Sequence, residues 1–193
     1  MAANTPSTIR FAPKGRIFVA PVGSKAPEDV ATPLDAAWKE LGYISPDGAE
    51  LTPSVDSQPV EVWQSATPVK YVVNSAACQL KFTLLQFDAD ATALYFGTTW
   101  VKAKKEDGTE VPNVFTLDLA STPELAEKAL VVEWGDANSV SRLVIERGMV
   151  SEREGLKLTR TSAQSLGVTF DALDSDGRLG YILTNASGIS AAA

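Results

Sequence analysis

The sequence of 193 residues contains no histidine and a single cysteine, Cys78. Without histidine the chain lacks the usual general base, the commonest metal ligand and every Ser-His arrangement for nucleophilic catalysis. One cysteine excludes a disulfide within the chain and a zinc site built on several thiolates. Cys78 lies on the apolar side of an alternating segment, so we interpret it as a small buried hydrophobic residue rather than a reactive thiol. We therefore predict no cofactor and no metal site.

Basic side chains and long apolar runs are also scarce. Lys and Arg total 17 against 24 Asp and Glu, which gives a net charge of −7. Such a surface repels phosphate backbones and anionic membranes, which argues against a conventional nucleic-acid binder but not against a protein that lies near DNA without holding it. No apolar run approaches the ~20 residues of a membrane-spanning helix, and residues 1–15 lack a basic-then-apolar signal pattern. We expect the protein to stay in the cytoplasm where it is made, or to be assembled there into something larger.

The sequence does contain strand patterning, which is densest between Trp38 and Gly97. Residues 78–84 alternate between apolar and polar side chains, and this alternation predicts a strand with one buried face. The period then changes, because Asp88 can cap a short helix over residues 88–96 and Gly97 can end it. About nine strands with this one helix predict a mainly β fold, an antiparallel sandwich or barrel with long loops between strands.

The same patterning sets the expected domain organisation. We expect a single β domain over residues 16–184, an N-terminal arm over residues 1–15 and a flexible C-terminal tail over residues 185–193. Residues 23–37 carry proline and glycine with few bulky apolar side chains, which predicts a long loop. Residues 46–68 begin with a Pro-Asp-Gly turn and continue with polar residues, so we interpret most of this segment as a second long loop that holds one short strand.

Two acidic patterns invite a chemical interpretation that their context does not support. Residues 174–177 resemble part of a calcium loop, but the EF-hand spacing would place an alanine and a leucine at ligand positions, so a turn is the better interpretation. Glu152 and Glu154 would share one face of a strand, as an acid–base pair does, but the basic residues beside them indicate a solvated edge. We predict no catalytic residue.

Trp63 differs from the other three tryptophans, which we interpret as core or half-core residues. Its neighbours are polar and prolines flank its segment, and a large aromatic residue between long loops is typical of a protein–protein interface. The predicted inter-subunit residues are Trp63, Pro46, Asp47 and Gly48.

The segment of residues 69–87 is too long for one flat strand, so residues 74–77 either bend the strand or form a hairpin turn.

Four segments of the chain form an ordered series, RIFVAPVG, WKELGYISPDG, VEVWQSATPVKYVV and LKFTLLQFDADATALYFG. This series resembles the major tail proteins of long-tailed phages, particularly those that infect actinobacteria, and it covers roughly residues 16–97. The later segments EWGDANSVSRLVIERGMVSEREGLKL and SLGVTFDAL fit the general strand layout of that group. The resemblance implies a β-sandwich-like subunit with one helix. It also implies six subunits per ring and rings stacked into the tail tube that conducts DNA.

The resemblance further implies a location in the virion tail, reached by assembly in the host cytoplasm, and no enzyme activity. Its implied partners are copies of the chain itself, a tape measure protein, and tail terminator and baseplate proteins, with no membrane. DNA would pass through the lumen without specific binding, and an acidic polar lining suits this passage because Lys or Arg would hold the phosphates. The predicted lumen-facing residues are Gln79, Thr83, Ser165, Thr169 and Asp171. Lys81 on the same face departs from an acidic lining.

Other functions stay open on the sequence alone. A β-sandwich binding or decoration module, adhesin-like or attached to a capsid, would carry its recognition loops at one end of the domain. A ring protein of a secretion tube would share the tail tube geometry. A cofactor-free enzyme is the least favoured class. The number of strands favours a ring, because joining sheet edges between copies removes the unpaired edges of each copy.

Overall fold

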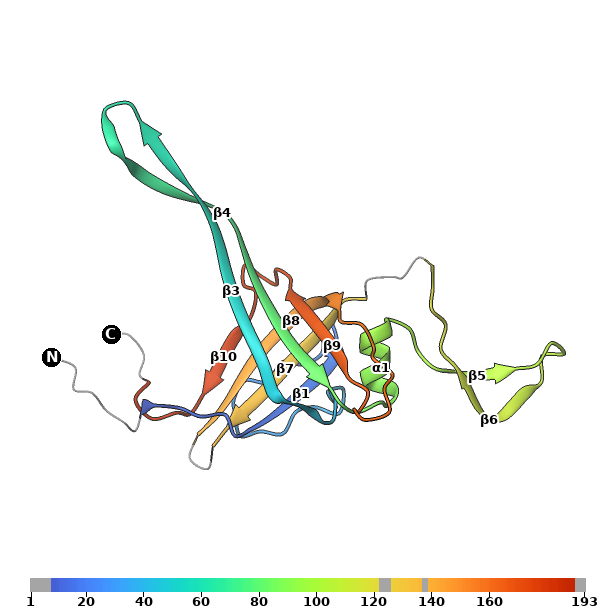
Figure 1. The fold of residues 1–193 in the computed structure, drawn as a ribbon. Coiled ribbons are helices and arrows are strands. Elements are labelled where there is room, and N and C mark those ends of the chain that lie inside the picture. Colours follow the sequence, from blue (N-terminus) through green and yellow to red (C-terminus); the bar gives the residue numbers. More distant parts are fainter. Residues whose placement is uncertain (1–7, 122–125, 137–138, 190–193) are drawn as a thin grey trace.

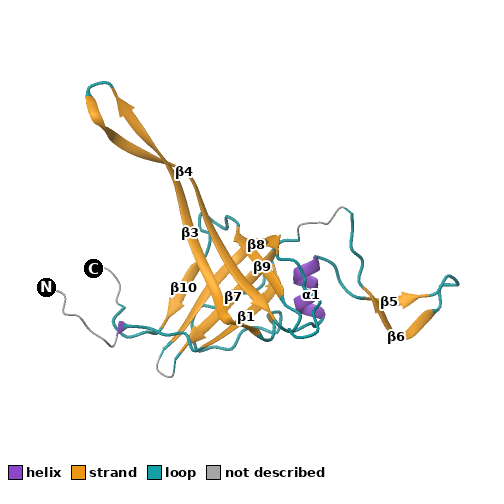
Figure 2. Cartoon of the chain, in the orientation of Figure 1, coloured by secondary structure: helices purple, strands orange, loops and turns teal. Residues whose placement is uncertain are grey.

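The computed structural model describes residues 8–121, 126–136 and 139–189. The chain is mainly β with one short helix, as the sequence predicts (Figures 1 and 2). Its elements, in chain order, are β1 (Lys14–Pro21), β2 (Lys39–Glu40), β3 (Ile44–Val62), β4 (Ser65–Leu84), α1 (Ala89–Phe96), β5 (Val101–Lys104), β6 (Glu110–Thr116), β7 (Lys128–Gly135), β8 (Val140–Arg153), β9 (Leu166–Ala172) and β10 (Tyr181–Thr184).

Eight of these strands form one antiparallel sheet in the order β2-β1-β7-β8-β9-β4-β3, with β10 paired to β8. The 14-residue strand β8 pairs through its first half with β7 and β10 and through its second half with β9. The change of partner occurs at Gly148, where an added Cβ would lie 2.3 Å from the Phe170 ring, so the close crossing requires glycine. Within the described residues the sheet ends at β2 and β3 and does not close into a barrel.

The main core lies on the inner face of this curved sheet and is covered at one side by α1. The predicted capping of α1 is confirmed, since the Asp88 carboxylate accepts the Ala91 N–H at 2.8 Å and Gly97 ends the helix at φ +76°. Leu94 and Tyr95 are buried among the sheet residues, and the Tyr95 hydroxyl donates to the Glu154 carbonyl. The predicted strand over residues 78–84 supplies the buried side chains of β4 to the same core.

A second, smaller core lies on the opposite face of β1, β7 and β8, under the segment of residues 23–38. Trp38 is buried there and its indole N–H donates to the Lys25 carbonyl at 3.0 Å. Residues 23–37 are outside regular strands, as predicted, but Leu34 packs on this core, so the loop has a structural role in its own subunit. The outer faces of β3, β4 and β9 lie outside this second core.

Arg142 fastens this segment to the sheet. Its side chain is 4% exposed and forms an ion pair with Glu133 at 2.8 Å. One guanidinium nitrogen also donates to the carbonyls of Asp29 and Thr32, at 2.8 Å each. Because the guanidinium is buried, these acceptors replace the water that it loses on folding.

We expect Arg142→Ala to lower the free energy of unfolding by about 3 kcal/mol, since the change leaves Glu133 and two carbonyl groups without their buried donor. Chemical denaturation of the purified variant measures this loss. Arg178→Ala is the matched control, because its ion pair with Glu146 is long, at 3.4 Å, and the Arg178 side chain is 52% exposed. Equal stability of the two variants would contradict a fastening role for Arg142.

The interpretation of residues 46–68 as a loop is wrong. Residues 44–62 and 65–84 form two strands of one long hairpin, and its outer half projects from the body as an arm (Figure 1). Residues 46–48 are part of β3, where the pairing register shifts and Gly48 takes φ +75°. Of the two alternatives for residues 74–77, the bend is correct, since the pairing skips one residue between Val73 and Ser75 and β4 continues. The true hairpin turn lies at residues 63–64.

Two other parts of the chain extend from the body. Strands β5 and β6 form a separate two-stranded hairpin beyond α1 (Figure 2). At the other side, the chain before β1 contacts the chain after β10, because the Arg10 guanidinium donates to the Ser187 carbonyl at 2.5 Å. The predicted division into an N-terminal arm (residues 1–15), a β domain (residues 16–184) and a C-terminal tail (residues 185–193) stays a prediction.

Candidate assembly surfaces

The outer half of the β3–β4 hairpin, residues 53–78, is hereafter called the arm. Ten residues of β3 lie between Pro53 and Val62, so the arm extends about 30 Å beyond the paired sheet. β4 last pairs with β9 at Gln79 and Asp171, and beyond this point each strand of the arm pairs with the other strand only, among the described residues. An isolated two-stranded ribbon is marginally stable in water, so the arm is a surface that is suited to a partner.

One face of the arm continues the apolar face of the core. The cross-strand pair Leu51 and Leu80 faces the core, and successive pairs on the same side of β3 carry this face outward. The exposed apolar side chains on this face include Pro53, Val55, Pro59, Tyr71 and Val73. Tyr71 alone is 63% exposed. A strand face with core-like composition and no cover is typical of a surface that is buried on assembly.

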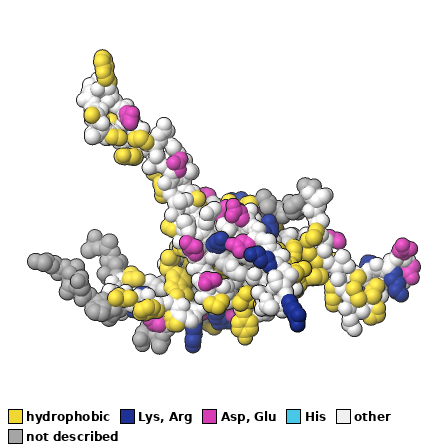
Figure 3. Space-filling view, in the orientation of Figure 1, with side chains coloured by type: hydrophobic (Ala, Val, Ile, Leu, Met, Phe, Trp, Pro, Cys, Tyr) yellow, Lys and Arg dark blue, Asp and Glu magenta, His cyan; other side chains and the backbone are white. Residues whose placement is uncertain are grey.

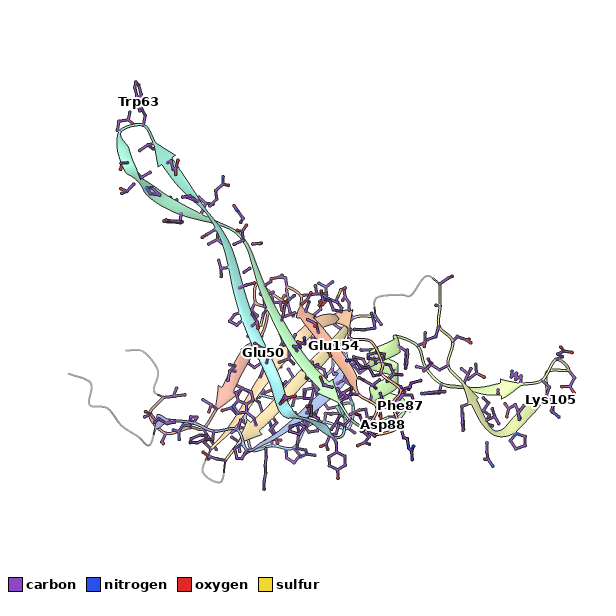
Figure 4. The ribbon with its side chains drawn as sticks, in the orientation of Figure 1. Glu50, Trp63, Phe87, Asp88, Lys105 and Glu154 are labelled. Atoms are coloured by element: carbon purple, nitrogen blue, oxygen red, sulfur yellow. The ribbon has the colours of Figure 1, made fainter. Side chains whose placement is uncertain are left out.

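Trp63 lies at the tip of the arm and is 100% exposed (Figure 4). The other tryptophans are in the environments that the sequence suggests. Trp38 is buried, Trp134 packs against the main core, and the Trp100 indole N–H donates to the Thr92 hydroxyl at 2.7 Å. The predicted interface role of Trp63 is therefore compatible with its position, and it stays a prediction.

The opposite end of the hairpin carries a cavity of about 1060 Å³. Its lining comes from β1, β2, β3, β4, β7, β8 and β10, from the chain before β1 and before β3, and from the chain after β4. Apolar residues of this lining include Ile17, Tyr43, Leu51, Trp134 and Ile182. Two predicted inter-subunit residues, Pro46 and Gly48, also line it, whereas the Asp47 carboxylate accepts a hydrogen bond from the Ser45 hydroxyl at 3.0 Å. The four predicted residues thus divide between the two ends of β3.

The predicted lumen-facing residues occupy one polar face of the sheet. Gln79 lies opposite Asp171 in the β4–β9 pairing, and the same register places Thr83 and Thr169 on this side of the two strands. Their neighbours in sequence point to the core, as the alternation of β4 and β9 requires. Ser165 directly precedes β9 and is half-buried. The structure therefore brings these residues to one side of the subunit, and their lumen role stays a prediction.

Acidic side chains lie near Lys81 on this face. Figure 3 shows acidic and basic side chains together on the body of the subunit, and Figure 4 marks Glu50 and Glu154 there. The Lys81 ammonium forms an ion pair with Glu154 at 2.9 Å, and this contact raises the pKa of Lys81, with smaller contributions from Glu50 and Glu152. Glu152 lies opposite Thr169 in the β8–β9 pairing. The carboxylates on the face are Glu50, Glu152, Glu154 and Asp171, and Lys81 is held by one of them. We call this surface the acidic face.

The sequence pattern gives no indication of Glu50, and it predicts a solvated edge for Glu152 and Glu154. A loop over residues 46–68 would give Glu50 no strand face, but in the structure Glu50 lies opposite Lys81 in the β3–β4 pairing. Residues 174–177 form the predicted turn, in which Ser175 and Arg178 exchange two backbone hydrogen bonds. Cys78 packs against the main core, and its partial burial raises the pKa of its thiol.

In the part of the chain that the structure describes, no helix has both the length and the apolar character needed to cross a membrane. A family model described as "Phage tail tube protein" matches residues 1–190. Among curated proteins, no sequence matches the chain.

Proposed function

The chain belongs to the phage tail tube protein family and is a structural component of the virion tail, and from this premise we propose that it forms hexameric rings that stack into a DNA-conducting tube. The family implies self-assembly together with other tail proteins, for which we propose a tape measure protein, a tail terminator and baseplate proteins. A structural family of this kind suggests no enzyme activity. The observation that carries the proposal is the arm, a long exposed hairpin with an apolar face that the described residues of its own subunit leave uncovered.

The open sheet supports closure into a ring. Among the described residues β3 is the last strand of the sheet, so its outer edge presents unpaired N–H and C=O groups. A head-to-tail contact between this edge and another copy closes into a ring when the rotation per subunit permits it. Pro46, Pro53 and Pro59 lie in this strand, and proline limits indiscriminate pairing at an edge. The six-fold number itself rests on the resemblance to tail proteins.

The acidic face supports a role as the lumen lining. Residues 23–38 cover the outer face of β1, β7 and β8, whereas the outer face of β3, β4 and β9 carries polar residues that no described segment covers in this way. Lys81 is the cation that could hold a phosphate there, and its pairing with Glu154 reduces its availability to DNA. The proposed lumen-facing residues are Gln79, Thr83, Ser165, Thr169 and Asp171. The proposed inter-subunit residues are Trp63, Pro46, Asp47 and Gly48.

Purified full-length chain tests the proposal directly. At high concentration we expect rings and tubes in negative-stain micrographs, because head-to-tail contacts multiply once subunits meet often enough. Dilution should return the material to small species in light scattering. A chain that stays a compact monomer at high concentration, or that forms only trimers around a bound ligand, would contradict the proposal and favour a decoration module.

A further inference from the structure

We propose that the cavity at the base of β3 is the receptor for the arm tip of a second copy, so that Trp63 of one subunit packs against Tyr43, Trp134 and Ile182 of the next. The inference rests on the proposed tube function and adds the surface that receives the arm. It also gives the predicted inter-subunit residues complementary roles. Trp63 is the side chain that inserts, and Pro46 and Gly48 at the start of β3 belong to the surface that receives it.

The tip has the chemistry of an anchor residue. Trp63 is fully exposed, and Val60 and Val62 beside it are also exposed. Tryptophan is enriched among the residues that dominate binding energy when they fill a pocket on a partner, because the ring buries a large apolar area with few rotatable bonds. A tryptophan at the end of a ribbon gives its own subunit little stabilisation, so its apolar area is available for a partner.

The cavity has the chemistry and size of a receptor for such an anchor. Its volume of about 1060 Å³ exceeds the space that one indole ring requires. Tyr43 at its wall is 79% exposed and Ile182 is 52% exposed, although both belong to a mainly apolar lining. Within the described residues the sheet ends at β3, and β10 pairs with β8 only, so these two strands border the cavity without pairing with each other. Tyr43 and Ile182 are therefore accessible from outside the subunit.

The two surfaces lie at opposite ends of one strand. β3 begins at the cavity with Ile44 and ends beside Trp63, and Figure 4 shows Trp63 remote from Phe87, which follows the end of β4. Each copy can therefore donate its tip to one neighbour and accept a tip from another, which is a heterologous contact that continues without closing. The 19 residues of β3 limit the repeat of such a stack to at most about 60 Å.

The competing occupant is the N-terminal segment of the same chain. Residues 12–16 line the cavity, so the chain that precedes them starts close to it. A segment that filled the cavity would exclude the arm of a neighbour, and the two occupants give opposite results on deletion. Removal of residues 1–11 should leave tubes intact if the arm tip is the occupant, whereas loss of tubes on this deletion would overturn the proposal.

Variants that inactivate each end separately provide the main test. Trp63→Ser removes the anchor, and Tyr43→Glu combined with Ile182→Glu places charge in the receptor at exposed positions that permit folding. We expect each variant alone to form rings but no tubes in negative-stain micrographs. An equimolar mixture should form pairs of rings that do not elongate, because only one of the two possible contacts has both intact surfaces.

Matched controls separate docking from general loss of apolar surface. Leu158→Ser removes a side chain that is similarly exposed but outside both surfaces, and it should elongate normally. Trp63→Phe should restore part of the tube length that Trp63→Ser loses. If wild-type chain forms tubes and Trp63→Ser forms equally long ones, the receptor assignment is wrong while the tube function stands. If wild-type chain forms no tubes, the proposed function itself fails.

Cross-linking tests the contact in assembled wild-type geometry. Gln64→Cys places a thiol at the arm tip and Pro46→Cys places one at the cavity, in a chain whose native thiol is removed by Cys78→Ala. The double-cysteine chain should give a ladder of dimers, trimers and longer species under a short thiol cross-linker, because the contact continues from copy to copy. A dimer band alone, or equal ladders from either single-cysteine chain, would overturn the proposed pairing.

Discussion

Subunits that lack the outer arm should remain folded but form no tubes. Asp56 and Ser75 lie directly opposite each other, so a two-residue Asn-Gly turn can replace residues 57–74 with favourable hairpin geometry. Neither core includes a residue of this segment in the described chain, so the melting temperature should change little. Tube length in micrographs should fall to single rings, since the deletion removes the tip together with Pro59, Tyr71 and Val73 of the exposed apolar face.

Substitutions within the arm show which of its two faces acts. Tyr71→Ser with Val73→Ser alters the apolar face and should shorten tubes strongly, since two exposed apolar side chains are lost. Ser54→Ala with Gln58→Ser alters the opposite face and should leave tube length unchanged. If truncated subunits still elongate, or if the two pairs of substitutions act equally, the arm does not stack subunits through its apolar face.

The elements that the sequence predicts well are those that local chemistry specifies. α1 begins at a capping aspartate and ends at a glycine with positive φ, and both signals lie within a few residues of the helix. The end of β4 alternates between core and solvent, so its periodicity is direct evidence of one buried face. In contrast, the contact of Arg142 with residues 29 and 32 joins segments more than a hundred positions apart and leaves no local pattern.

The sequence did not predict the arm as a hairpin, and the reason is physical. Periodicity identifies a strand when one face is buried in the same chain, but both faces of the arm are exposed in the isolated subunit. Proline usually interrupts a central strand. Pro53 and Pro59 are tolerated because they lie in an edge strand, whose outer N–H groups need no partner. Trp63 lies outside the core, as expected for an aromatic residue among polar neighbours with no apolar stripe to join, and its interface role stays a prediction.

The candidate surfaces were predictable in part. Alternation along β4 and β9 placed Gln79, Thr83, Thr169 and Asp171 on polar faces, and pairing of these two strands brings them together. Glu50 and Glu152 lie on the acidic face because of the register of β3 and β8, which the sequence does not specify. Glu154, just after the end of β8, forms an ion pair with Lys81, and this contact reduces the availability of the lysine to DNA in the proposed lumen.

If the acidic face lines the proposed tube, reversal of its charge should make the tube retain DNA. Glu50→Lys with Glu152→Lys raises the net charge of a subunit from −7 to −3 and adds two lysines at exposed positions of the face. In the proposed ring of six subunits this places twelve new ammonium groups around the proposed lumen. Each phosphate that pairs with one releases counterions, so duplex binding should appear at low salt and weaken steeply as salt rises.

Tubes assembled with short duplex DNA measure this effect. We expect variant tubes to protect bound DNA from nuclease and wild-type tubes to leave it unprotected, because only DNA inside the lumen is shielded. Glu28→Lys with Glu106→Lys is the matched control, since it makes the same change in net charge at exposed positions away from the acidic face. Its tubes should bind DNA, if at all, in a nuclease-sensitive form. Equal protection by both variants would mean that the acidic face does not line the lumen.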